Sequence, residues 1–174
     1  MNSIYDEVDF DLESFIQPFI MAPELWRVFD IKDLTDLDFD KWQTLKLLDD
    51  NENRFSDHID LVPQDMGGIY VYCIQPSVLP LCGSYIMYIG MTADQSLRTR
   101  VKQYQRELGS KYKREKLHRM FKKWGKYVHL YFLPVSSTKE TIETLEDRLI
   151  ASLLPPCNPK IRIESIKRAV NAFS

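Results

Sequence analysis

Two charged side chains of opposite sign lie at the edges of apolar helical stripes in the second half of the chain. At about 100° per residue, Glu146 lies about 40° around its helix from Ile142, and Arg100 lies about 60° from Leu97. An arginine in such a place suits a phosphate, and a carboxylate suits a metal ion. The pair therefore fits a phosphate-cleaving site, and it fits buried ion pairing equally well.

Tyrosines are concentrated in two short β-rich runs, GGIYVY at 67–72 and YIMYIGMT at 85–92. Alternation along a strand places Tyr70 and Tyr72 on one face of the first run, and Tyr88 on one face of the second. Tyrosine is common in strands, so ordinary packing explains each of these residues taken alone.

The elements that would position these residues follow the order β-β-α-α-β-α from Gly68 onward. We expect strands at IYVYCI, YIMYIG and YVHLYFLPV, the first two forming a hairpin. We expect helical pieces at DLESFIQPFI and DFDKWQTLKLLDD, and helices at 94–108, 114–124 and 137–154. The last begins with Ser137 and Glu140 as a capping box, and its apolar stripe is Ile142, Leu145, Leu149 and Leu153. The predicted fold is α+β, a small antiparallel three-stranded sheet flanked by helices.

The charge of the chain changes sign at about residue 66. Residues 1–66 hold 17 Asp and Glu against 5 Lys and Arg, a net charge of −12, whereas residues 67–174 hold 8 against 18, a net charge of +10. We therefore expect two parts: an acidic, mostly helical N-terminal extension over 1–66 and a basic domain over 67–174. The basic part suggests a polyanionic partner, and the acidic part suggests regulation or docking of a partner protein.

Composition excludes several classes of protein. Three cysteines without a CxxC or Cys/His cluster argue against a disulfide scaffold and a structural zinc site. No apolar run reaches the roughly 18 residues that span a bilayer, and the acidic N-terminus lacks a signal-peptide pattern. We expect a cytoplasmic protein with no membrane partner.

The two tripeptides Gly68-Ile69-Tyr70 and Tyr88-Ile89-Gly90 resemble the two-part signature of the GIY-YIG nuclease superfamily. The resemblance covers about residues 67–160 and does not include the first 66. It continues along the chain in the order of the family. Arg100 and Tyr104 match an arginine followed four residues later by His or Tyr, and Glu146, Pro155 and Asn158 match the spacing of the last helix and its end.

The resemblance implies a metal-dependent phosphodiesterase. Glu146 would ligate one divalent ion, Mg²⁺ or Mn²⁺, and Arg100 would clamp the phosphate. Tyr70 would position the attacking water or take its proton, for which Arg100 and the metal would have to lower its pKa. Tyr88 would be the second phenol, and Tyr104 a backup base or phosphate contact.

Three further residues would support the site. Gly68 belongs to the first tripeptide, and Gly90 would allow a close approach of the backbone at the end of its strand. Asn158 would tie the end of the last helix to the sheet.

Basic residues with interleaved aromatics over 111–126 suggest a face that follows a nucleic-acid backbone, although such runs are also ordinary solvated helix surface. The candidate nucleic-acid contacts are Arg98, Lys102, Lys111, Lys113, Arg114, Lys116, Arg119, Lys122, Lys123 and Lys126. DNA is the expected partner, RNA is not excluded, and the oligomeric state is left open.

The size and cysteine content favour a compact DNA endonuclease of restriction, phage defence or mobile-element processing. The alternatives are a non-catalytic nucleic-acid-binding or adaptor protein on a nuclease fold, and a DNA-repair nuclease subunit.

Overall fold

A computed structural model describes residues 39–76, 83–109, 114–158 and 160–172. The helix expected at DLESFIQPFI, most of the loop between the two tripeptides, Lys111 and Lys113 lie outside the described residues.

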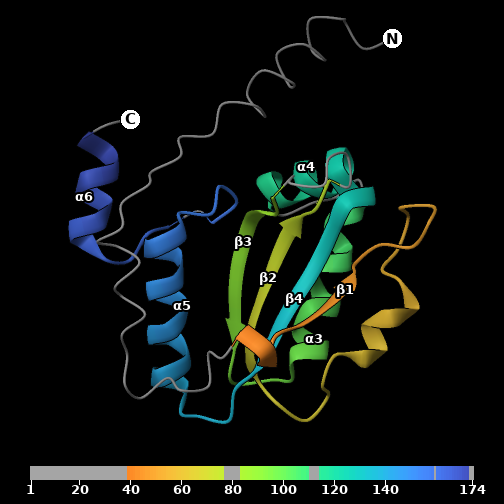
Figure 1. The fold of residues 1–174 in the computed structure, drawn as a ribbon, viewed down its shortest axis with the longest axis horizontal. Coiled ribbons are helices and arrows are strands. Elements are labelled where there is room, and N and C mark those ends of the chain that lie inside the picture. Colours follow the sequence, from red (N-terminus) through yellow and green to blue (C-terminus); the bar gives the residue numbers. More distant parts are fainter. Residues whose placement is uncertain (1–38, 77–82, 110–113, 159, 173–174) are drawn as a thin grey trace, which may run out of the picture.

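The described part of the chain is an antiparallel sheet with helices on both faces (Figure 1). The strands run in the spatial order β1-β4-β2-β3 and are β1 Gln43–Lys46, β2 Gly68–Ile74, β3 Tyr85–Thr92 and β4 Val128–Pro134. The three expected strands and the β2–β3 hairpin are confirmed. The sheet has a fourth strand, β1, which the sequence analysis did not predict.

Strand β1 corrects the prediction of a helix over DFDKWQTLKLLDD. The segment begins with a short 3-10 turn at Phe39–Lys41 and then pairs with β4, with Leu45 opposite Leu130. Leu45 and Leu47 are both buried. A spacing of two between buried leucines is the period of a strand, and the β4 ladder satisfies the backbone groups that a helix would have satisfied internally.

The helices follow the expected order, with changes at their ends. They are α3 Leu97–Lys102, continued by a 3-10 helix at Gln103–Leu108, then α4 Glu115–Trp124, α5 Lys139–Leu153 and α6 Glu164–Ala172. Short 3-10 turns lie at Asp57–Leu61 and Gly125–Tyr127.

Two details of the last helices differ from the prediction. The cap of α5 is Thr138, whose hydroxyl accepts from the Thr141 N–H, and not Ser137. Leu153, expected in the apolar stripe, is 38% exposed, whereas Ala151 and Ser152 just before it are buried. Helix α6 was not predicted.

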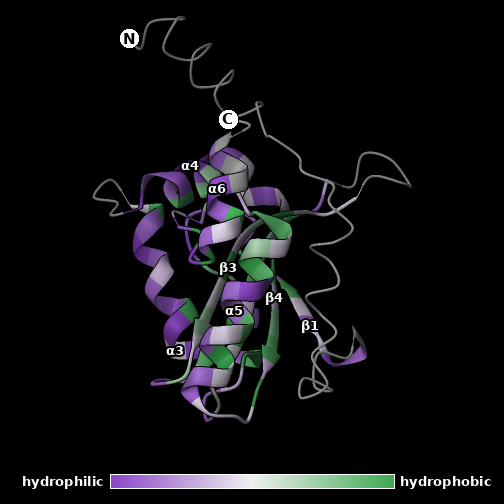
Figure 2. Ribbon diagram, turned by 90° about the vertical axis from the view of Figure 1, so that its left-hand side faces the viewer, coloured by the Kyte–Doolittle hydropathy of each residue, from purple (hydrophilic) through white to green (hydrophobic). Residues whose placement is uncertain are grey.

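Each face of the sheet has its own core. On the α5 face, Ile69, Val71 and Ile89 pack with Ile142 and Leu145. Figure 2 shows this face toward the viewer, with hydrophobic colour along the strands and α5 lying across them. These strand residues alternate with the tyrosines, which point to the opposite side as predicted.

On the opposite face, which we call the tyrosine face, Tyr70 and Tyr72 pack against α3, α4 and the segment before β2. This segment contributes Leu47, Leu48 and Val62, each with no exposed surface. Residues that precede the predicted division at residue 66 therefore share one core with the strands that follow it, and the division itself stays a prediction.

Candidate active site

Three tyrosine hydroxyls meet on the tyrosine face, and we call them the phenol cluster: Tyr70, Tyr88 and Tyr104. The Tyr104 hydroxyl is the hub, 2.7 Å from the Tyr70 hydroxyl and 3.0 Å from the Tyr88 hydroxyl. All three side chains are buried. The cluster joins both strands of the hairpin to the 3-10 helix that continues α3.

The hairpin register explains why the second tripeptide ends in glycine. Gly90 lies directly opposite Tyr70 in the β2–β3 ladder. A Cβ atom at Gly90 would collide with the Cζ and Oη atoms of Tyr70, so the phenol occupies the space that a side chain would take. Gly90 thus leaves room for the Tyr70 side chain, whereas the sequence predicted only a close approach of the backbone.

Gly68 at the start of β2 has a different requirement. Its φ of 149° lies in a region that L residues with a side chain rarely adopt, and an added Cβ would meet the Leu133 carbonyl oxygen of β4. The first tripeptide therefore begins with glycine because β2 enters the sheet against β4 at this point.

Two arginines donate to the phenol cluster. Arg100 on α3 donates from Nε to the Tyr70 hydroxyl at 3.3 Å. Arg114, just before α4, donates from Nη1 to the Tyr104 hydroxyl at 2.8 Å and to the Tyr88 hydroxyl at 3.0 Å. The sequence analysis placed Arg114 among the outer basic residues, and its contact with the cluster was not foreseen.

Burial sets the protonation of these phenols. Burial and the neighbouring Tyr104 raise the pKa of Tyr70 well above its ordinary value, and the smaller effect of Arg100 lowers it. Burial likewise raises the pKa of Tyr88, against the lowering effect of Arg114. Tyr70 and Tyr88 are therefore protonated at neutral pH in this structure, and Arg100 alone does not lower the pKa of Tyr70 enough for it to act as a base.

Glu146 lies on α5 with its side chain 13% exposed. Burial raises the pKa of this carboxyl, while the Arg162 guanidinium, the Met91 backbone and Arg100 lower it. The Arg162 Nη1 atom is 4.0 Å from Glu146 Oε2 and 3.2 Å from Asp147 Oδ1. Arg162 is 60% exposed, so the ion pair expected as one alternative is present at the surface. Its partner is not a buried arginine.

Strand β3 separates the carboxylate from the phenol cluster. It is the edge strand of the sheet, with α5 against one face and α3 on the other (Figure 1). The Met91 backbone and the Arg100 guanidinium both affect the pKa of Glu146, which puts the carboxylate near the end of β3 that follows Gly90. Arg100, on the other face, therefore lies within electrostatic range of Glu146, and the two side chains form no ion pair in the described part of the chain.

The side chains at this site suit a hard divalent cation that takes few of its ligands from the protein. Among the described residues no group of three or more His, Cys, Asp or Glu side chains is placed to hold a metal. Mg²⁺ needs only one or two carboxylates and otherwise keeps its waters. Glu146 is partly desolvated, and its one ion pair among the described residues is a 4.0 Å pair with the exposed Arg162, so it fits this requirement as a single ligand.

Asn158 joins the segment after α5 to β3. Its Oδ1 accepts from the Ile89 N–H at 2.9 Å, and its Nδ2 donates to the Ile89 carbonyl at 2.8 Å. The Cys157 N–H donates to the Met87 carbonyl at 2.9 Å. These bonds hold the end of α5, and with it Glu146, beside the strand that carries Tyr88 and Gly90.

The candidate nucleic-acid contacts are placed in several different environments. Arg98 donates to the carbonyls of Val62 and Asp60, and Lys102 pairs with the Asp60 carboxylate at 2.8 Å. These two residues therefore attach α3 to the preceding 3-10 turn.

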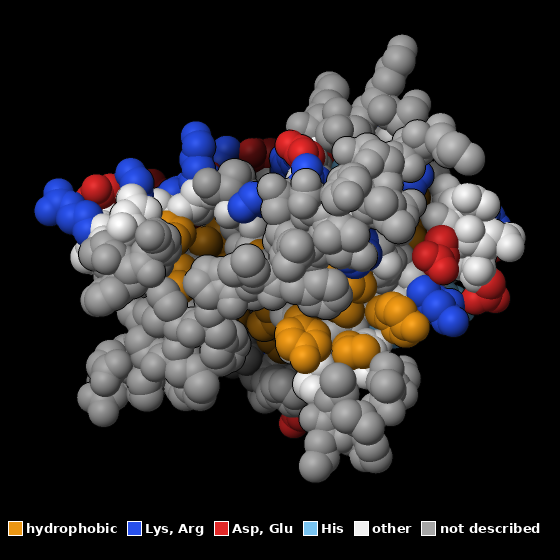
Figure 3. Space-filling model, turned by 90° about the horizontal axis from the view of Figure 1, so that it is seen from above, with side chains coloured by type: hydrophobic (Ala, Val, Ile, Leu, Met, Phe, Trp, Pro, Cys, Tyr) orange, Lys and Arg blue, Asp and Glu red, His pale blue; other side chains and the backbone are white. Residues whose placement is uncertain are grey.

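The basic residues of α4 and its C-terminal turn are closer to the predicted surface role. Lys116 donates to the Pro156 carbonyl, Arg119 pairs with Glu115, and Lys123 and Lys126 lie over the rings of Trp124 and Tyr127. Seen from above, Lys and Arg side chains are interspersed with Asp and Glu beside a group of hydrophobic side chains (Figure 3). Their binding of nucleic acid stays a prediction.

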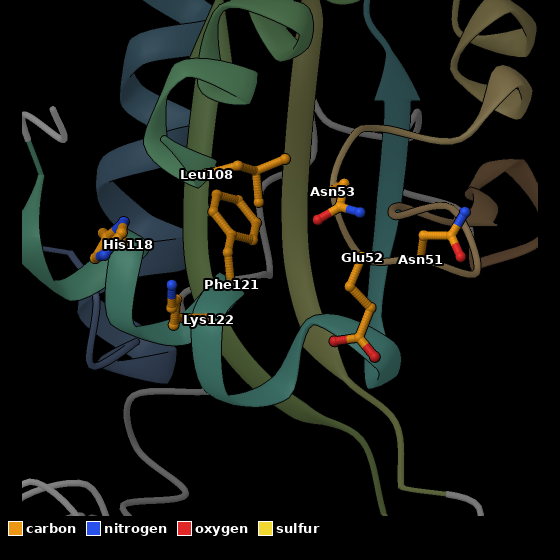
Figure 4. A pocket seen from close by; sticks show the side chains of 7 residues that line it. All are labelled: Asn51, Glu52, Asn53, Leu108, His118, Phe121 and Lys122. Atoms are coloured by element: carbon orange, nitrogen blue, oxygen red, sulfur yellow. The ribbon is translucent and has the colours of Figure 1, made fainter. Parts of the chain in front are cut away.

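A cavity of about 240 Å³ lies between α4 and the turn at 51–53 (Figure 4). Its lining residues are Asn51, Glu52, Asn53, Leu108, His118, Phe121 and Lys122. No member of the phenol cluster and neither of its arginines lines it, so it is separate from the site described above.

Comparisons with known proteins were made for the whole chain. The family model described as GIY-YIG catalytic domain matches residues 66–159, more than half of the chain. Searches of curated proteins and of solved structures gave no significant match. Within the described residues, no helix is long and apolar enough to cross a membrane.

Proposed function

The chain belongs to the GIY-YIG endonuclease superfamily, and we propose that it is a metal-dependent endonuclease that hydrolyses phosphodiester bonds in DNA. The observation that carries this proposal is the hydrogen bond of Arg100 to a cluster of three phenols, with the carboxylate of Glu146 within electrostatic range of the same arginine. A cation for the phosphate and a carboxylate for a divalent ion are the two parts that phosphodiester hydrolysis needs.

In this scheme Glu146 holds Mg²⁺ or Mn²⁺, and the bound ion supplies Lewis-acid stabilisation of the charge on the phosphate and the leaving oxygen. Arg100 binds the phosphate, because its guanidinium is half-buried and fixed by Tyr70 and by Gln103 Oε1 at 3.0 Å. A fixed donor loses little entropy when charge develops in the transition state.

The burial of Tyr70 favours one of its two expected roles. A phenol whose pKa is raised well above the ordinary value stays protonated, so it positions a water molecule by hydrogen bonding and does not accept its proton. Tyr104 then fixes the orientation of Tyr70 through their 2.7 Å bond, and Tyr88 fixes Tyr104.

The proposed biological setting is restriction, phage defence or mobile-element processing. This setting is proposed by analogy within the superfamily whose catalytic domain the chain carries.

Cleavage of a supercoiled plasmid tests the proposal. We expect nicked and linear products with Mg²⁺ and none with EDTA, and we expect Arg100→Gln to reduce the rate by about 10²–10³-fold through loss of transition-state charge stabilisation. Arg54→Gln is the matched control, since Arg54 is 59% exposed and pairs only with surface aspartates among the described residues. Plasmid that is bound but never cut under any metal would support the non-catalytic adaptor instead.

A further inference from the structure

Arg100 and Arg114 come from different elements and approach the same ring. The guanidinium carbon of Arg100 lies 5.5 Å from the Tyr104 ring centroid, and that of Arg114 lies 5.0 Å from it. One belongs to α3 and the other is the residue before α4. The fold therefore places two guanidinium groups around a single tyrosine, although like charges repel.

Neither arginine has a carboxylate partner among the described residues. Their side-chain partners are phenols and, for Arg100, the Gln103 amide. Tyr70 and Tyr88 are neutral, because burial raises the pKa of each.

One carboxylate, that of Glu107, contacts Arg114 through its backbone and not through its guanidinium. Glu107 Oε2 accepts the backbone N–H of Arg114, and Glu107 Oε1 lies 3.6 Å from Arg106 Nε. Two guanidinium groups that approach one ring, with no carboxylate bonded to either among the described residues, form a positively charged site that suits an anion.

Donors remain for such an anion. A guanidinium has five N–H groups in a planar fork. Arg114 uses Nη1 for both phenols, which leaves Nε and Nη2 without a partner in the described part of the chain. Arg100 uses Nε and Nη1, which leaves Nη2. The free edge of Arg114 matches the two-oxygen geometry of a phosphate.

We propose that Arg114 is a second phosphate ligand, which together with Arg100 forms a two-arginine site around Tyr104 for the backbone phosphates of the nucleic-acid substrate. This inference rests on the proposed function for the identity of the anion as a phosphodiester. It changes the role of Arg114 from one charge on an outer helix face to a fixed contact inside the site. Tyr104 then acts as the spacer that holds the two guanidinium groups apart.

DNA binding without metal tests the proposal independently of cleavage. The full chain in EDTA is titrated into a fluorescein-labelled DNA duplex, and anisotropy is measured across a series of salt concentrations. Each phosphate contact contributes about 0.7–0.9 to the slope of log affinity against log salt. We expect Arg114→Gln to weaken binding about tenfold and to reduce this slope by about one.

Two variants separate charge from structure. Arg114→Lys keeps a point charge, so it should retain the wild-type slope with affinity between that of the wild type and Arg114→Gln. Arg54→Gln should change neither quantity. A merely structural Arg114 would lower the affinity of Arg114→Gln at an unchanged slope, and that result, like wild-type binding by Arg114→Gln, would overturn the proposal.

Free phosphate offers the same chemistry, so a second titration uses inorganic phosphate as competitor for the labelled duplex. Displacement of the duplex by millimolar phosphate that requires Arg114 supports the site. If phosphate binding requires Arg114 but the affinity for the duplex does not, the proposed role of Arg114 in nucleic-acid binding is overturned. If the wild type binds DNA through Arg114 and never cuts it, the nuclease proposal fails and the two-arginine site stands.

Discussion

On the α5 face the sheet buries Ile69, Val71 and Ile89 against leucine and isoleucine side chains, whereas on the tyrosine face it buries phenols that accept from two arginines. The α5 face is a conventional apolar core, and its one contribution to the site is Glu146 at the border. The tyrosine face also has apolar side chains, but its buried hydroxyls are groups that need hydrogen-bond partners. One face thus fixes the position of the carboxylate, and the other holds the polar groups that would meet the substrate.

The largest expected effect comes from deleting the segment before β2, which packs against the tyrosine face. Removal of residues 1–66 deletes β1 and exposes the surface covered by Leu47, Leu48 and Val62. Each fully buried side chain of this kind contributes about 1.5–3 kcal/mol, against a total stability of about 5–15 kcal/mol. We expect insoluble protein or loss of cooperative unfolding, measured by circular dichroism.

The matched control for this deletion is a chain that begins at residue 39, which retains every described residue. It should unfold cooperatively. A folded chain that lacks 1–66 would show that the tyrosine face does not depend on the preceding segment, and higher cleavage by that chain would indicate that the acidic extension masks the basic domain.

Glu146→Gln tests the single contribution of the α5 face. We expect cleavage to fall by about 10³-fold, since the substitution removes the only carboxylate proposed as metal ligand. DNA binding in EDTA should be unchanged within about twofold, because an amide does not remove a phosphate contact. Retention of Mg²⁺-dependent cleavage would exclude Glu146 as the ligand.

The same substitution has a predictable effect on stability. Burial raises the pKa of Glu146, so the folded chain retains this proton to higher pH than the unfolded chain. Its stabilising contribution is therefore present at low pH and is lost as the pH rises through the raised pKa. Glu146→Gln should raise the Tm at neutral pH relative to the wild type, and the difference should shrink as the solution is acidified.

Substitutions of two tyrosines on β2, Tyr70 and Tyr72, test the tyrosine face. Tyr70→Phe removes a hydroxyl that bonds Arg100 and Tyr104, and we expect cleavage to fall by about 10–100-fold at little cost in stability. Tyr72→Phe is the matched control, because the Tyr72 hydroxyl is buried with no hydrogen-bond partner among the described residues. It should leave cleavage unchanged and stabilise the fold by about 1 kcal/mol. Equal effects of the two substitutions would assign both tyrosines to packing.

The smallest expected effect concerns Arg162, which lies after the matched catalytic domain. Its pair with Glu146 at 4.0 Å is exposed, and such pairs contribute about 0.2–1 kcal/mol. Arg162→Gln should lower the Mg²⁺ concentration for half-maximal cleavage by about two- to fivefold, as the cation no longer competes with an arginine. A higher Mg²⁺ requirement would show that Arg162 helps to hold the ion or the substrate.

The strands and their hairpin were predictable because β-branched and aromatic runs ended at glycine or proline. β1 was not, because a strand of four residues is stabilised by its ladder with β4, about 85 residues away in the chain, and its charged surroundings favour a helix locally. The cap of α5 was missed by one residue, which is the ordinary uncertainty of helix ends.

The candidate site, like the fold, was predictable from the sequence only in part. The helical spacing brought Arg100 and Tyr104 to one face, and the structure places both beside Tyr70. The contact of Arg114 depends on how α4 packs against the 3-10 helix at Gln103–Leu108, and no local pattern in the sequence encodes that packing. The raised pKa of Tyr70 was equally hidden, since burial is a property of the packed sheet and not of the strand.

The bonds from Cys157 and Asn158 to β3 have a consequence for the solution behaviour of the protein. An edge strand presents unpaired N–H and C=O groups that recruit a strand from another molecule and so promote aggregation. Here the Met87 carbonyl and both backbone groups of Ile89 are already bonded by the segment after α5. The side-chain amide of Asn158 thus substitutes for a neighbouring strand, and the sheet is protected against templated growth along the edge that carries its site.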